Sequence, residues 1–157
     1  EAALLACVSL LMLCSAVMFT QLLAVTGATS ALTEVVTKLE VNRWVMFFVM
    51  MALPFFLCMF IDQLGLMLII VPIYLPILKV LEFDPVWFWL LFLINITLGA
   101  ITPPFGYTLF AFKAVVPDMS ISQVYRVIWP FVILFLIGIA VIIAFPAIAT
   151  WLPELVG

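Results

Sequence analysis

The chain has 157 residues, of which 69% are apolar and only 8% are charged, and its mean hydropathy is +1.50. Five basic and eight acidic side chains cannot cover the core of a soluble globule, so the composition predicts an integral protein of the lipid bilayer. A net charge of −3 offers no basic surface to nucleic acid, and the lack of histidine excludes Ser/His and Cys/His nucleophilic sites and histidine-bound zinc. The three cysteines lie inside apolar runs, and we expect them to be buried hydrophobes: Cys7, Cys14 and Cys58.

The first apolar run, Ala2 to Thr20, is long enough for a transmembrane helix, which needs about 20 residues to cross roughly 30 Å of hydrocarbon. We expect this helix to cover residues 2–26 and a connection to cover residues 27–42. The chain begins with Glu1 rather than methionine, and no basic leader precedes the apolar run. The sequence therefore reads as a fragment of a longer protein.

Two shorter apolar runs follow, of 18 and 15 residues, and only Asp62 and Gln63 join them. As helices they would reach about 27 and 22 Å, which is short for a bilayer crossing. They predict a re-entrant hairpin over residues 43–80 with its tip near 62–65, a structure tolerated at membrane depth only beside protein or a water-filled cavity. The alternative is two tilted spans with Asp62 at the far surface.

The next apolar run has 27 residues and would make about 40 Å of continuous helix, more than the hydrocarbon layer requires. We predict a broken transmembrane helix over residues 86–115, with the break at 99–106. The adjacent prolines Pro103 and Pro104 remove two backbone donors and disfavour helical geometry at Thr102.

A break at this position should free backbone carbonyls around Leu98, Gly99 and Ala100, and such groups are costly in hydrocarbon. We therefore expect a cation or an ordered water to bind them. The alternative is a simple proline kink, which is the interpretation we give to three other prolines in apolar runs: Pro54, Pro130 and Pro146.

The last apolar run predicts a transmembrane helix over residues 126–152, after a helix start capped by Ser120 or Ser122. The connection from Lys113 to Arg126 is the only one with net positive charge, so the positive-inside rule places it in the cytoplasm and the C-terminus outside. Four tryptophans near the ends of apolar runs are interpreted as an interfacial belt: Trp87, Trp89, Trp129 and Trp151.

Asp62 is the only acid with long apolar runs on both sides, and no Lys or Arg lies within ten residues of it. An ionisable group inside a membrane is a functional hypothesis by default. If the hairpin tip meets the broken helix, Asp62 joins Gly99 and Thr102 in an all-oxygen site that suits sodium. Helix N-termini near Leu64 and Phe105 would attract an anion to the same place.

Three stretches carry a resemblance to a known family: MFIDQLGLMLIIVPIYLPI (Met59 to Ile77), FDP (Phe83 to Pro85) and GAITPPFGYTLFAFK (Gly99 to Lys113). Together they closely resemble the C-terminal half of the large membrane subunit, the DctM-like or M subunit, of tripartite ATP-independent periplasmic (TRAP) transporters. The resemblance is strong from about Arg43 to Pro153 and weak over the first 40 residues. The final WLPELVG looks like that subunit's natural C-terminus.

The resemblance implies an all-α polytopic membrane protein, specifically one inverted-repeat half of an elevator-type ion transporter with a re-entrant hairpin and a discontinuous helix. It implies a symporter of the bacterial inner membrane, with a periplasmic C-terminus, that imports an organic acid using sodium as the coupling ion and no other cofactor. The family's second sodium site carries over to Asp62, Gly99 and Thr102. The candidates for the substrate cavity are Gln63, Asn95, Pro103, Gly106 and Thr108.

The implied partners are the N-terminal repeat of the same subunit, the small TRAP membrane subunit and a periplasmic substrate-binding protein. Two positions depart from the family pattern, since members often have Gly at Cys58 and Asn at Thr108, and this leaves the substrate contacts open. The alternative function is a channel or passive assembly subunit in which the break is only a hinge. An intramembrane aspartyl protease would need two facing aspartates, so the sequence does not indicate an enzyme.

Overall fold

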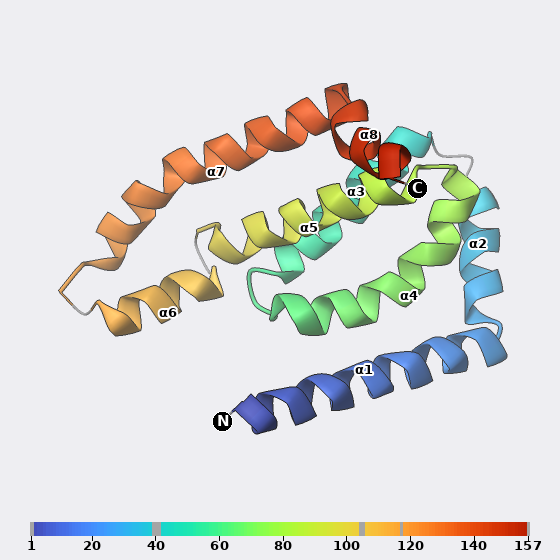
Figure 1. Cartoon of the computed structure of the whole chain (residues 1–157), viewed down its shortest axis with the longest axis horizontal. Helices are drawn as coiled ribbons and strands as arrows, with labels where there is room; N and C mark the ends of the chain where they lie inside the picture. The colour runs from blue at the N-terminus through green and yellow to red at the C-terminus, as the bar shows by residue number, and fades with distance from the viewer. Residues whose placement is uncertain (1, 39–41, 104–105, 117, 157) are drawn as a thin grey trace. The chain divides into compact units, whose positions relative to one another are not determined.

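The computed structural model describes residues 2–38, 42–103, 106–116 and 118–156, and within these residues it is helical, without strands (Figure 1). This confirms the all-α class. The elements in chain order are α1 (Ala2–Val25), α2 (Ala28–Lys38), α3 (Arg43–Leu57), α4 (Gln63–Leu81), α5 (Pro85–Ile101), α6 (Tyr107–Val115), α7 (Ile121–Ala144) and α8 (Ala147–Val156).

The chain forms two compact units. The first comprises Glu1–Phe47 and Leu64–Glu82, and the second comprises Phe48–Gln63 and Phe83–Gly157. The second unit therefore contains most of α3, the turn after it and all of α5 to α8, which are the elements that hold the predicted site.

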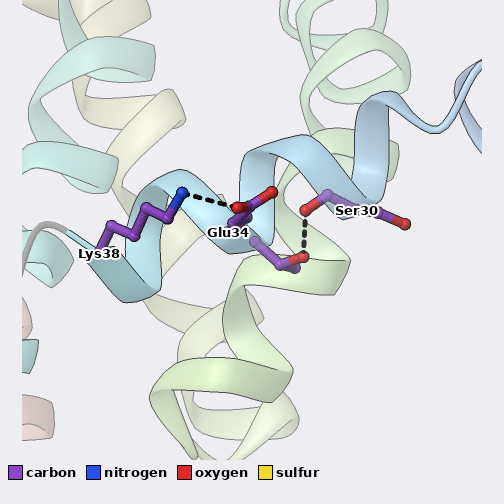
Figure 2. A network of polar contacts seen from close by, with 4 residues as sticks. Ser30, Glu34 and Lys38 are labelled. Carbon is purple, nitrogen blue, oxygen red and sulfur yellow. Dashed lines mark hydrogen bonds and ion pairs between the residues drawn. The ribbon is translucent and has the colours of Figure 1, made fainter.

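Helix α2, in the first unit, lies where the sequence predicted only a connection. Helix α1 ends at Val25, and Gly27 takes a φ of +72°, a conformation that favours glycine and lets the chain turn into a new helix. The side chain of Lys38 pairs with Glu34 one turn earlier at 2.7 Å, as Figure 2 shows, although both are exposed and the pair adds little stability. The sequence of α2 mixes polar and apolar residues and contains no long apolar run, so the apolar runs predicted only a connection here.

Helix α3 has 15 residues and retains Pro54 inside it, whereas α4 has 19 residues and contains both Pro72 and Pro76. Helix α4 is thus longer than the apolar run that predicted it, and it is long and apolar enough to cross a bilayer, as is α7. Of the two helices predicted to form the hairpin, only α3 is too short to cross a bilayer comfortably, and the re-entrant hairpin stays a prediction.

Helix α5 is the most buried element of the second unit and packs against α6, α7 and α8 (Figure 1). Its start is well defined because Pro85 occupies the first turn and the Asp84 carboxylate accepts a hydrogen bond from the backbone N–H of Trp87 at 2.8 Å. The side chains that α5 buries most completely are large and apolar: Trp87, Phe88, Leu91, Phe92, Ile96 and Leu98. They fix α5 within this unit.

Helix α7 begins as predicted with Ser120 as its N-cap, which forms a capping box with Gln123. The prediction of one continuous helix over residues 126–152 is wrong, because α7 ends at Ala144 and α8 begins at Ala147. Pro130 is accommodated inside α7, but Pro146 marks a true elbow. Phe145, the residue before it, leaves helical geometry with φ −127° and ψ 75°, as the residue preceding a proline often does.

The elbow explains why Trp87 is buried rather than part of an interfacial belt. Pro146 has no N–H to donate to the carbonyl of Ile142, four residues earlier. The indole N–H of Trp87 donates to that carbonyl instead, at 3.0 Å, and the tryptophan is only 4% exposed. Trp129 and Trp151 remain exposed, as an interfacial position requires.

We expect Trp87→Phe to destabilise the protein by about 1–3 kcal/mol, because the Ile142 carbonyl loses its donor and phenyl fills less of the buried space than indole. Unfolding in detergent micelles measures the effect, and Trp129→Phe on exposed α7 surface is the matched control. In a Pro146→Ala background a backbone N–H returns at position 146, so the cost of Trp87→Phe should fall by more than half. An equal cost in both backgrounds would contradict this account of the elbow.

Candidate functional site

The chain leaves helical geometry between α5 and α6. Helix α5 ends at Ile101, Thr102 is extended with φ −81° and ψ 128°, and α6 resumes at Tyr107. The amide of Gly106 donates to the carbonyl of Thr102 at 3.1 Å, which closes the loop. Residues 104–105 lie outside the described residues. They are the second proline of the pair and Phe105, near which the second half of the broken helix was expected to begin. The interruption falls within the segment 99–106 where the sequence predicted it.

The carbonyls freed by this break have protein partners, so the expectation that they lack them is wrong. The hydroxyl of Thr102 donates to the Leu98 carbonyl at 2.5 Å, and its backbone N–H donates to the Gly99 carbonyl at 3.3 Å. Across the break, the hydroxyl of Thr108 donates to the Ala100 carbonyl at 2.7 Å. Threonine hydroxyls commonly bond to nearby backbone in this way. Each carbonyl keeps a second lone pair that could bind an ion or water.

A second set of contacts joins α5 to the end of α3 and to residues 58–63, which we call the 58–63 turn. A Cβ atom placed on Gly99 would lie 2.5 Å from the carbonyl oxygen of Phe55 and 3.1 Å from the Cβ of Cys58. No larger side chain fits, so glycine permits this close approach of two backbones. Cys58 is fully buried, unlike Cys7 and Cys14, which are exposed and for which the prediction of burial is wrong.

Two of the substrate-cavity candidates make hydrogen bonds that join α5 to α3 and to the 58–63 turn. The Asn95 side-chain amide donates to the carbonyl of Met51 at 2.7 Å. The Gln63 side-chain amide donates to the hydroxyl of Thr97 at 3.1 Å, and that hydroxyl donates to the Leu93 carbonyl at 2.8 Å. These contacts bring the 58–63 turn and the last turns of α5 together.

Asp62 immediately precedes Gln63 at the start of α4, and its side chain is exposed. Its carboxylate lies within electrostatic range of the thiol of Cys58, whose Cβ faces Gly99. The other candidates lie along the break itself: Thr102 and Gly106 are buried, and Pro103 and Thr108 are half-buried. The structure thus brings the turn that carries Asp62 against the helix that carries Gly99, while the sodium site assigned to Asp62, Gly99 and Thr102 stays a prediction.

Within the described part of the chain, no group of three or more Cys, Asp or Glu side chains could hold a metal ion. An ion at this place would therefore depend on one carboxylate, threonine hydroxyls and backbone carbonyls. Such hard oxygen donors, with only one negative charge among them, suit a weakly bound monovalent cation better than a transition metal.

The contacts of Met51, Phe55 and Thr97 were not predicted from the sequence. The sequence contained one indication of the contact between α5 and α3: Asn95 and Gly99 are four residues apart and therefore share a face of α5. Their partners on α3, Met51 and Phe55, have the same spacing. The two helices therefore meet over successive turns and run in the same direction there.

Comparison with known proteins gives a consistent result. Residues 1–148 match the family described as "Tripartite ATP-independent periplasmic transporter, DctM component". The chain is 38% identical over 104 residues to the sialic acid TRAP transporter permease protein SiaT of Haemophilus influenzae, covering 66% of this chain and 17% of that protein. It is 27% identical over 143 residues to the C4-dicarboxylate TRAP transporter large permease protein DctM of Pseudomonas aeruginosa, covering 91% of this chain and 33% of that protein. An uncharacterized protein of Salmonella typhimurium, YgiK, is 32% identical over 79% of this chain and 28% of its own length. The chain therefore spans a third or less of each of these relatives.

Proposed function

Because the chain belongs to the DctM family of TRAP transporter large permease subunits, we propose that it forms part of a sodium-coupled transporter that imports an organic acid. Family membership confirms the resemblance read from the motifs around Asp62 and Thr102. It makes a membrane transport role, rather than an enzymatic one, the natural assignment. Two of the relatives are named as permeases for sialic acid and for C4-dicarboxylate, so a carboxylate is the substrate class that we propose here.

One observation supports the proposed sodium coupling: the turn that carries Asp62, an acid with apolar runs on both sides in the sequence, packs on α5 within two turns of the place where that helix breaks. Gln63 bonds to Thr97, and α5 ends four residues later at Ile101. The proposed site combines the Asp62 carboxylate with hydroxyls and the second lone pairs of carbonyls near the break. These are the ligands that a sodium ion prefers.

The same break supports an anion site. Helix α6 begins at Tyr107, and Gly106 before it provides no side chain to cap the first amides. The positive end of the α6 dipole therefore faces the break and would stabilise a substrate carboxylate. Broken helices that bind the coupling ion on one side and the anionic substrate on the other recur in secondary transporters.

The wider assembly follows from the same assignment. We propose that the subunit lies in the bacterial inner membrane with its C-terminus in the periplasm. It acts by an elevator motion together with its N-terminal repeat, a small membrane subunit and a periplasmic binding protein. Its N-terminal repeat supplies the first sodium site and part of the substrate site.

Uptake into vesicles tests this proposal directly. The complete transporter, reconstituted with its binding protein, is offered labelled sialic acid, a C4-dicarboxylate or ectoine, the compounds named for its relatives. We expect one of them to accumulate only when an inward sodium gradient is imposed, and potassium should not replace sodium. Equilibration without accumulation, at a rate indifferent to sodium, would favour the channel alternative and end the proposal.

A further inference from the structure

Two side-chain amides connect the 58–63 turn and α3 to α5, and the proposed ion and substrate sites do not use them. We propose that Gln63 and Asn95 are positioning residues, which hold Asp62 in place against α5 and contact no substrate. The inference rests on the proposed function in one respect: it takes Asp62 as the acidic ligand of the proposed sodium ion. It reassigns both residues from the substrate cavity, where the sequence had placed them.

The Asn95 bond supports a weakened turn of α3. Pro54 cannot donate to the carbonyl of Met50, so the helix lacks one of its own hydrogen bonds there. The Asn95 amide donates to the adjacent carbonyl, that of Met51, at 2.7 Å. This is a short bond for an amide and places α5 firmly beside the last two turns of α3. The 58–63 turn begins one residue after α3 ends at Leu57, so its starting position is set by this contact.

The Gln63 bond fixes the other end of the turn. The Thr97 hydroxyl gives its single proton to Leu93, so its lone pairs face outward and accept from the Gln63 amide at 3.1 Å. Gln63 is the residue after Asp62, and neighbouring Cα atoms are about 3.8 Å apart. A movement of Gln63 away from Thr97 therefore moves the Asp62 backbone with it.

Cys58 lies between the two bonds along the chain and reports whether the turn is seated on α5. Its side chain is 0% exposed, and its Cβ faces the open side of Gly99. If either bond is lost and the turn separates from α5, this thiol becomes reachable. Because the other two cysteines are exposed, they can be replaced by serine without disturbing the contact.

The experiment measures the rate at which N-ethylmaleimide labels Cys58 in the complete transporter carrying Cys7→Ser and Cys14→Ser. We expect Gln63→Leu and Asn95→Leu each to raise the rate about tenfold, the effect of a side-chain hydrogen bond worth about 1.4 kcal/mol. Thr97→Val should match Gln63→Leu, and the double variant should add nothing, because both changes break one bond. Thr97→Ser should leave the rate unchanged, and so should Gln21→Leu, which changes an exposed glutamine of α1 in the other compact unit.

Two further measurements separate positioning from other roles. Thermal unfolding should show the variants folded at the labelling temperature, and a labelling gain that occurs only with global unfolding would overturn the inference. In uptake, the sodium concentration for half-maximal rate should rise while the substrate KM at saturating sodium stays constant, and a changed KM would make these residues substrate contacts. If the wild type shows no sodium dependence, the proposed function fails, yet the labelling rates still decide whether the two amides seat the turn.

Discussion

Gly99→Ala is expected to be among the most damaging substitutions in the chain, with a loss of stability of about 3 kcal/mol or more and loss of transport. The new Cβ would lie 2.5 Å from the Phe55 carbonyl oxygen, closer than real Cβ contacts come. The obstacle is backbone, which cannot rotate away as a flexible side chain can, so α5 and α3 must separate. Separation would also stretch the Asn95 bond to Met51.

The matched control is Gly138→Ala on α7, where an added Cβ meets nothing within 4 Å. It should be neutral or stabilising by up to about 1 kcal/mol, since alanine favours helix over glycine. Unfolding in detergent compares the two variants. Cys58→Gly should not rescue Gly99→Ala, because it relieves the 3.1 Å contact and leaves the carbonyl in place. Equal stability of the two alanine variants would refute the close approach described for α3 and α5.

Asp62→Asn is expected to abolish sodium coupling without unfolding the protein. The change removes the negative charge and keeps the size of the side chain, so a cation loses the strongest of its proposed ligands. We expect the sodium concentration for half-maximal uptake to rise by about tenfold or more, or uptake to cease. Because the Asp62 side chain is exposed, stability in detergent should change by less than about 0.5 kcal/mol.

Asp118→Asn provides the control for Asp62→Asn, since it makes the same chemical change at an exposed position between α6 and α7. Uptake at graded sodium concentrations, with potassium keeping ionic strength constant, compares both variants with the wild type. Wild-type sodium dependence in Asp62→Asn would remove the carboxylate from the ion site. An equal loss in Asp118→Asn would assign the effect to net charge rather than to this position.

The sequence by itself determined features that depend on local residue chemistry, such as the N–H donor that proline lacks or the residue types that a helix N-cap prefers. Apolar composition indicated a helical membrane protein, and the proline pair predicted an interruption that falls between Ile101 and Tyr107. Ser120 was correctly predicted, with Ser122 as the alternative, as the N-cap of the helix that follows, and it forms a capping box with Gln123. The motifs around Asp62 and Thr102 indicated the family, which the family match confirms.

The tertiary structure decided which side chains donate hydrogen bonds to the carbonyls that the prolines deprive of a backbone donor. Pro146 shows from sequence alone that a carbonyl four residues earlier loses its donor, but only the packing of α5 on α7 supplies the Trp87 indole. The carbonyls before the break were expected to bind a cation or a water, yet the hydroxyls of Thr102 and Thr108 donate hydrogen bonds to them. The reason is physical: a proline deletes a donor locally, whereas its replacement comes from whichever side chain the fold brings within about 3 Å.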